Sequence, residues 1–258
     1  MRLITIPMSH YCEKARWGLE RAGLAYREDA HLQVFHYRAA RRYNPTGMVP
    51  VLVTGEEVIC DSTAILQYID RRLPEADRLY PAQYRSEVES LEEQFDEQLG
   101  VETRRWVYFH WQQLPTREVL STAGQGAPAW ERRLAPLLMP LLLKFLEKRL
   151  AINPANIKSG ARIIQSSFDQ VAARLSDGRA YLCGHRFTAA DLAFASMAAP
   201  VLLPPEYGIR LPSLDQAPAS ARAQIRQFRA HPAGAYALRL FRNVRRQNPA
   251  LAPHLGLP

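Results

Sequence analysis

Residues 9–16, Ser-His-Tyr-Cys-Glu-Lys-Ala-Arg, decide how the first part of this chain folds. They follow a short apolar run at residues 3–6 that is typical of a buried strand, and Pro7 helps to end it because proline donates no ladder hydrogen bond. Helical periodicity then continues through residues 11–22. We therefore expect Ser9 at the N-terminus of a helix, where unpaired N–H groups and a partial positive charge stabilise an anion such as a thiolate.

The composition is typical of a soluble globular protein. The chain has 258 residues, 47% of them hydrophobic, which suits one large domain or two small ones. Its most apolar run, residues 134–143, contains two prolines and is shorter than the roughly 20 residues that cross a bilayer. The N-terminus has no secretory signal pattern, so we expect a cytoplasmic protein without a membrane partner.

The three cysteines, Cys12, Cys60 and Cys183, are scattered along the chain. An odd number at these spacings predicts neither a disulfide framework nor a metal-ligand set. We therefore expect free thiols in a reducing compartment and no bound metal.

The formal net charge is +8, and much of the excess is late in the chain. No nucleic-acid recognition motif accompanies these arginines, so we interpret them as a solvated helix face and a basic tail. A positive field would also favour an anionic substrate or cofactor. The residues are Arg222, Arg226, Arg229, Arg239, Arg242, Arg245 and Arg246.

The periodicity changes near residue 80. Before it, the pattern predicts the order β-α-β-α-β-β-α, with strands at 3–6, 26–30, 51–53 and 58–60 and helices at 11–22, 37–43 and 62–73. After it, helices are expected at 86–111, 132–150, 159–175, 189–199 and 219–229. Residues 114–130 are rich in Pro, Gly, Ser and Thr, which predicts a loop.

This order resembles that of the cytosolic glutathione transferases. Ser9 precedes the first helix, Val49 and Pro50 precede the third strand, and Asp61 and Ser62 open the third helix. The resemblance covers nearly the whole chain, although residues 114–160 are longer and less familiar. It implies an α/β thioredoxin-like, glutathione-binding domain at 1–80 and an all-α domain at 81–258 that forms an electrophile pocket, in a homodimer with glutathione as co-substrate.

Ser9 matches the family's catalytic serine or cysteine, and the alternative is that it only caps the helix. A thiol has a pKa near ~8.5, and lowering it by about two units corresponds to roughly 2.7 kcal/mol in favour of the thiolate. A hydroxyl hydrogen bond and the helix N-terminus could supply this together. Cys12 occupies the second position of a C-x-x-C pattern and is either a packed thiol or a nucleophile. Tyr11 is a further rival for thiol activation.

The resemblance also implies how glutathione would be held. Val49 and Pro50 match a cis-proline turn whose backbone pairs with the cysteinyl amide. Asp61 and Ser62 match an acidic-Ser pair that takes the γ-glutamyl amino and carboxylate groups, and both also suit a helix cap. His36 lies near a position that contacts the glycyl carboxylate in some classes, unless it is simply a solvated loop residue. The alternatives are Arg38, Arg41 and Arg42.

Two further patterns belong to the helical part. Thr188 and Asp191 form a capping-box pattern ahead of an apolar run, for which we expect a structural role only. The second pattern is a cluster of aromatic residues that is either core or a wall of the electrophile pocket. Its members are Trp106, Tyr108, Phe109 and Trp111.

The sequence thus predicts a glutathione transferase-like enzyme that ionises the thiol of glutathione beside Ser9 and adds it to an electrophile. One alternative is a glutathione-dependent thiol–disulfide oxidoreductase that uses Cys12. Another is a non-catalytic binding protein that has kept the fold. The electrophile itself cannot be read from these residues.

Overall fold

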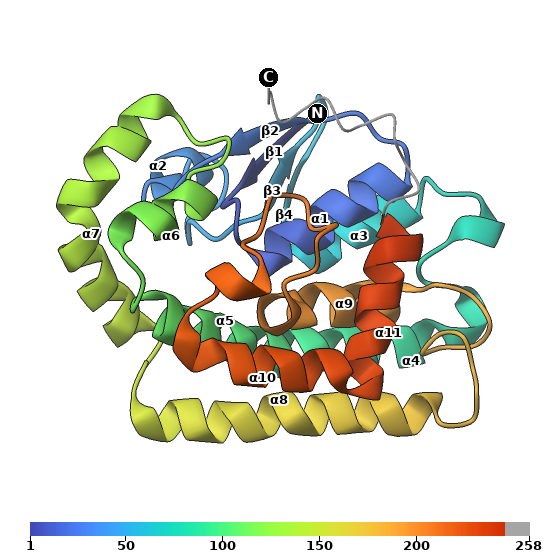
Figure 1. The fold of residues 1–258 in the computed structure, drawn as a ribbon. Helices are drawn as coiled ribbons and strands as arrows, with labels where there is room; N and C mark the ends of the chain where they lie inside the picture. Colours follow the sequence, from blue (N-terminus) through green and yellow to red (C-terminus); the bar gives the residue numbers. More distant parts are fainter. Residues whose placement is uncertain (246–258) are drawn as a thin grey trace.

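A four-stranded mixed sheet forms the first part of the computed structural model, which describes residues 1–245 (Figure 1). The strands lie in the order β2-β1-β3-β4, with β1 and β2 parallel and the other pairs antiparallel. The predicted strands are confirmed, and they alternate with three helices, α1, α2 and α3. The bounds are β1 (Arg2–Thr5), α1 (His10–Arg21), β2 (Arg27–Ala30), α2 (His36–Ala40), β3 (Val51–Val53), β4 (Val58–Cys60) and α3 (Ser62–Asp70).

Helices α1 and α3 pack closely against each other below the sheet (Figure 1). Gly18 makes this approach possible, because a Cβ atom there would lie 2.3 Å from Leu66 Cδ2. Leu3 and Leu52 on the sheet and Leu66 on α3 are fully buried in the core.

Beyond the sheet the described chain is helical, which confirms the predicted fold class. Helix α9 lies at the centre, where it packs against α1, α4, α5, α10 and α11, and its residues are almost all buried (Figure 1). A π-helical turn, Phe95–Leu99, separates α4 from α5. No helix among residues 1–245 is both long and apolar enough to cross a membrane. The helices are α4 (Arg85–Gln94), α5 (Gly100–Trp111), α6 (Thr116–Ala123), α7 (Ala129–Arg149), α8 (Pro154–Leu175), α9 (Ala189–Leu202), α10 (Ala219–Ala230) and α11 (Pro232–Asn243).

The predicted loop at residues 114–130 is wrong, since α6 and the start of α7 occupy it. Pro115 and Pro128 stand just before the two helices, where a missing N–H costs nothing. Pro136 and Pro140 lie inside α7, so prolines do not mark helix ends in this segment. Helix α11 was also missed, because its arginines were interpreted as part of a basic tail; Arg246 lies outside the described residues.

The capping box at the start of α9 is confirmed. Asp191 is fully buried, and its Oδ2 accepts hydrogen bonds from the Thr188 N–H at 2.7 Å and the Thr188 hydroxyl at 2.9 Å. Its Oδ1 accepts from the Leu182 N–H at 2.7 Å and from the Tyr236 hydroxyl. The carboxylate therefore ties α9 to α11 and to the preceding connection as well as capping its own helix.

A buried cation joins the sheet domain to the helices. Lys14 on α1 has no exposed side-chain surface, and its Nζ lies 2.7 Å from Glu92 Oε1 and 2.5 Å from Asp96 Oδ2. It also donates to the Thr63 hydroxyl at 2.9 Å, and the Tyr80 hydroxyl donates to Glu92 at 2.7 Å. Burial opposes the charge, but the two carboxylates outweigh it and raise the pKa of Lys14.

We expect Lys14→Met to destabilise the protein by about 3–5 kcal/mol, because it leaves two buried carboxylates without their cation. Urea unfolding followed by circular dichroism measures this change. The matched control is Arg85→Met, which breaks the exposed Arg85–Glu89 pair on α4 and should cost less than about 1 kcal/mol. Equal effects of the two substitutions would contradict the structural importance of Lys14.

Candidate active site

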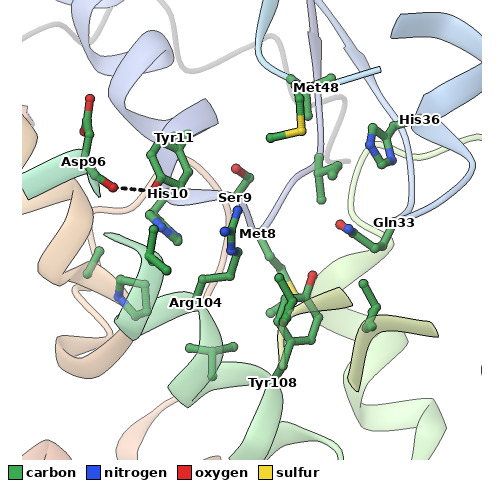
Figure 2. Close-up of a pocket in the computed structure, with 18 of the residues that line it drawn as sticks. Met8, Ser9, His10, Tyr11, Gln33, His36, Met48, Asp96, Arg104 and Tyr108 are labelled. Carbon is green, nitrogen blue, oxygen red and sulfur yellow. Dashed lines mark hydrogen bonds between the residues drawn. The ribbon is translucent and has the colours of Figure 1, made fainter. Parts of the chain in front are cut away.

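A cavity of about 780 Å³ lies between the sheet domain and the helices α5, α7 and α9. Its volume falls in the range of small-molecule sites, about 300–1,000 Å³. The first turn of α1 supplies Ser9, His10 and Tyr11, the segment before α2 supplies Gln33, and α5 supplies Arg104 and Tyr108 (Figure 2). The cavity therefore joins residues from both parts of the chain.

Ser9 is the N-cap of α1 and lines the cavity. Its Oγ accepts a hydrogen bond from the Cys12 N–H at 3.4 Å, which is long for such a bond. The capping and the cavity-facing interpretations of Ser9 are thus compatible. Its hydroxyl hydrogen can be donated to an anion beside the positive end of the helix.

Tyr11 lines the same cavity, but its hydroxyl donates to the Asp96 carbonyl oxygen at 2.6 Å (Figure 2). Burial, with smaller effects from neighbouring charges, raises the pKa of this phenol well above its usual value. His10, whose Nε2 lies 2.9 Å from the Gly100 carbonyl oxygen, is buried and has its pKa lowered to about 3 by burial and by Arg104. Both side chains are therefore neutral and engaged with α5 or the π-helical turn.

Cys12 is fully buried on α1 and does not line the cavity. Burial raises the pKa of its thiol to about 11, although Arg16 and Ser9 oppose the rise. A thiol in this state is a poor nucleophile at neutral pH.

The turn before β3 and the start of α3 have the geometry that the sequence predicts. The Val49–Pro50 peptide bond is cis, and Val49 lines the cavity. The Pro50 carbonyl oxygen accepts from the Asp61 N–H at 3.1 Å, which places Asp61 beside this turn. Asp61 caps α3 through the Thr63 N–H at 2.8 Å and also lines the cavity. Ser62 is fully buried, and its Oγ has no hydrogen-bond partner among the described residues.

Backbone strain is concentrated around the cavity. Four non-glycine residues among residues 1–245 have positive φ: Val34, Asp61, Ala151 and Leu203. Asp61 and Leu203 line the cavity, and the other two are adjacent to lining residues. Strained backbone of this kind persists where the surrounding structure holds a functional geometry.

The end of the cavity near α2 contains two residues with different roles. His36 is buried rather than solvated, and burial together with the charge of His31 lowers its pKa to about 4. It is therefore neutral at pH 7, and its Nδ1 has no partner among the described residues. Arg149, from the end of α7, lines the same end and donates to the Met48 sulfur at 3.9 Å. None of the three alternative arginines, Arg38, Arg41 and Arg42, lines the cavity.

The aromatic cluster divides between the cavity and the core. Tyr108 and Trp111 line the cavity, whereas Phe109 does not and packs edge-on against His110. Trp106 is buried and donates to Gln224 at 2.6 Å. The expected place of Phe109 in the pocket is therefore wrong, because consecutive residues of α5 face different sides of the helix.

The unfamiliar middle segment forms one wall of the site. A second, apolar cavity of about 120 Å³ lies under α6 and α7 and shares Tyr108 and Trp111 with the first. Leu120, Met139 and Leu142 line it. Helices α6 and α7 thus extend the apolar part of the pocket.

Sequence reasoning missed several residues of the cavity: Gln33, Asp96, Glu97, Arg104 and Arg149. No motif marks them, because they come from helices and loops distant in sequence. The one available signal was the position of Arg104 just before the aromatic residues of 106–111. Among residues 1–245, no group of three or more His, Cys, Asp or Glu side chains could hold a metal ion.

Comparisons with known proteins agree with this geometry. Residues 3–77 match the family model of the glutathione S-transferase N-terminal domain. A zeta-class glutathione S-transferase of Euphorbia esula is 56% identical over 34 residues, which are 13% of this chain and 15% of that relative. The chain therefore matches only a small part of the length of this curated relative.

Several solved structures share the fold over almost the whole chain. A glutathione S-transferase of Ceriporiopsis subvermispora in complex with glutathione has a TM-score of 0.64 at 16% identity, covering 93% of this chain and 96% of that one. One of Methylobacterium radiotolerans in complex with glutathione sulfonate has a TM-score of 0.54 at 20% identity, covering 92% and 93%. The β-etherase LigF of a Sphingobium species has a TM-score of 0.58 at 19% identity, covering 92% and 97%.

The fold and the matched N-terminal domain define a thioredoxin-like domain followed by a helical region. Residues 3–77 thus match the N-terminal domain of the glutathione S-transferases, and the chain shares the fold of solved members of that superfamily. Because that superfamily fold also supports a β-etherase, the reaction must be argued from the site.

We expect one thiol to react readily with a disulfide reagent in the native protein. Cys60 is half-buried and lines the cavity, whereas Cys12 and Cys183 are buried. Titration with Ellman's reagent should detect one accessible thiol in the folded protein, none in Cys60→Ala, and all three of the wild type after denaturation. A rapidly reacting thiol that remains in Cys60→Ala would contradict the burial of Cys12.

Proposed function

We propose that this protein binds glutathione and ionises its thiol beside Ser9 for attack on an electrophile. The observation that carries the proposal is the position of Ser9: its hydroxyl lines the cavity at the N-terminus of α1. The two rival groups are less suited, because the Tyr11 hydroxyl is already bonded to Asp96 and the Cys12 thiol is buried.

Several polar groups around the cavity fit glutathione. Asp61, which lines the cavity, would take the amino group of the γ-glutamyl moiety. Ser62 is fully buried and does not line the cavity, but its N–H and its unpartnered hydroxyl follow directly at the start of α3 and would take the γ-glutamyl carboxylate. The backbone of Val49 beside the cis-proline turn would pair with the cysteinyl amide. Neighbours with the same fold contain glutathione or glutathione sulfonate.

The glycyl carboxylate of glutathione is negatively charged and would bind a cation, for which Arg149 is our candidate. Neutral His36 can offer a ring N–H or a lone pair but no charge at pH 7. Arg149 is close enough to His36 to help lower its pKa, so its guanidinium lies on the same side of the cavity. Together, Arg149 would provide the charge and His36 a hydrogen bond.

In the proposed reaction, the Ser9 hydroxyl donates a hydrogen bond to the sulfur and the thiol proton passes to solvent. The N-terminus of α1 stabilises the resulting thiolate. The sulfur lone pair forms the C–S bond, and the leaving group departs with the electrons of the bond that breaks. Tyr108 and Trp111 would contact the apolar part of the electrophile.

The burial of Cys12 disfavours the thiol–disulfide alternative, and the intact set of polar groups disfavours a purely structural role. A domain boundary near residue 80 stays a proposal. So do a homodimer, a cytoplasmic location and the lack of nucleic-acid and membrane partners.

Ser9→Ala should lower conjugation of glutathione to 1-chloro-2,4-dinitrobenzene by roughly one to two orders of magnitude at neutral pH. The reason is the loss of one charge-assisted hydrogen bond, worth about 1.5–3 kcal/mol. The pKa of bound glutathione, followed by thiolate absorbance, should rise in parallel. Cys12→Ala is the matched control, and it should retain conjugation; full activity in Ser9→Ala would refute the serine mechanism.

Arg149→Gln should raise the KM for glutathione about two- to fivefold, because it removes an exposed charged partner of the glycyl carboxylate, worth up to about 1 kcal/mol. The kcat with saturating glutathione should change little, since the reacting sulfur lies at the opposite part of the ligand. Arg42→Gln, an exposed arginine outside the cavity, is the control for net charge. Equal KM values for both variants would remove Arg149 from the binding site.

A further inference from the structure

Arg104 is a cation without an anion in the wall of the cavity. Its side chain rises from α5 into the cavity and points toward the Ser9 end (Figure 2). The structure shows no carboxylate of residues 1–245 within ion-pair distance of it, and its buried Nε has no hydrogen-bond partner there. Its one direct contact of note is with the Tyr11 ring, whose centroid lies 5.8 Å from the guanidinium carbon.

The surroundings of Arg104 are largely apolar. Val101 and Val107 from the same helix line the cavity with Arg104, as do Leu203 and Leu211. Acidic residues also line it, among them Asp96 and Glu97, but none of those in the described chain forms an ion pair with Arg104. A guanidinium held in such surroundings loses hydration, and a cation that has lost water and has no partner favours an anionic ligand strongly. Arginine also matches a carboxylate in geometry, because its planar fork can donate two parallel hydrogen bonds.

Tyr108 supplies a second donor near Arg104. It lies one turn further along α5, and its hydroxyl makes no hydrogen bond with another described residue (Figure 2). Burial raises the pKa of Tyr108 to about 12, while the charge of Arg104 opposes the rise, so the two groups are close enough to interact. Tyr108 therefore stays protonated at neutral pH and can donate to the same anion.

Arg104 does not coincide with the groups that hold glutathione in the proposed function. Those groups come from α3, the cis-proline turn and the α2 end of the cavity, whereas Arg104 and Tyr108 come from α5. Arg104 lies on the helical side of Ser9, where the second substrate would approach the sulfur (Figure 2).

We propose that the electrophile of this protein is an apolar compound with a carboxylate, which Arg104 binds with help from the Tyr108 hydroxyl. The proposal rests on the proposed function for the identity of the site, but the binding of a carboxylate can be measured without turnover. It adds the chemical class of the second substrate, which the sequence does not indicate.

The test uses two substrates that differ in charge, 4-chloro-3,5-dinitrobenzoate and its methyl ester. Wild type should prefer the carboxylate, measured as the ratio of kcat/KM for the two compounds after each value is divided by the rate constant of the uncatalysed reaction with glutathione, because the ester group activates the ring more than the carboxylate does. Arg104→Gln should lower this ratio by about tenfold to a hundredfold, the size of one lost charge-assisted hydrogen bond. Arg104→Lys, which keeps the charge, should recover part of the preference, and Arg162→Gln on the exposed face of α8 is the control for net charge.

Three outcomes would overturn the proposal. The first is an unchanged ratio in Arg104→Gln. The second is an equal loss with both substrates together with a raised pKa of bound glutathione, which would place Arg104 on the thiolate instead. The third is a wild type that does not prefer the carboxylate.

A binding measurement separates this proposal from the proposed function. Calorimetric titration with unreactive 3,5-dinitrobenzoate and its methyl ester reports the same preference when no reaction occurs. If wild type conjugates neither chlorinated compound but binds the acid better than the ester, and Arg104→Gln removes that difference, the conjugation proposal fails and the carboxylate site stands. If the acid and the ester bind alike, the carboxylate site fails whatever the activity.

Discussion

The buried charge of Lys14 is the constraint on which the site depends. An unpaired ammonium in the interior is so unfavourable that Lys14 must keep contact with Glu92 and Asp96 in the folded state. These three residues belong to α1, α4 and the π-helical turn, so the sheet domain and the helices cannot shift apart at this point. Thr63 joins the same network through its hydroxyl, which fixes the first turn of α3 as well.

One network thus positions both helix N-termini that face the cavity. The backbone carbonyl of Asp96 accepts from Tyr11 in the first turn of α1, next to Ser9. On the other side of α1, buried Glu13 pairs with Arg16 at 3.0 Å and accepts from the Gly208 N–H at 3.0 Å. Helix α1 is therefore held by charged groups on two sides, in addition to the apolar contacts of its buried residues.

The predictable and the unpredictable parts of the structure differ in physical origin. Strands and capping residues follow from local chemistry, so residues close in sequence predict them, whereas the cis-proline turn at Val49 and Pro50 was expected only from the family resemblance. The cavity around Arg104 depends on how α5, α7 and α9 cross, which distant packing decides. Helix α6 and the first residues of α7 escaped prediction because residues 114–130 are rich in Pro, Gly, Ser and Thr, a composition typical of loops; the rest of α7 was predicted although it contains Pro136 and Pro140. Phe109 is an example of what residue type alone does not predict: the sequence shows an aromatic cluster, but it does not show which of its side chains face the cavity.

The two arginines of the cavity have unlike surroundings, and this difference decides what each can contribute to recognition. Arg149 is exposed, so water already solvates its guanidinium. An ion pair there replaces this hydration and contributes little net binding free energy. Arg104 is half-buried, and its Nε is out of reach of other polar groups of the described chain, so much of its desolvation has already occurred on folding. A carboxylate therefore binds Arg104 with a larger gain in free energy than it binds Arg149. The reason is that folding has already removed much of the water from the Arg104 guanidinium, so binding does not have to remove it. On the proposed function, glutathione would obtain its affinity from many modest contacts along the cavity, whereas selection of the second substrate would depend mainly on this one half-buried cation.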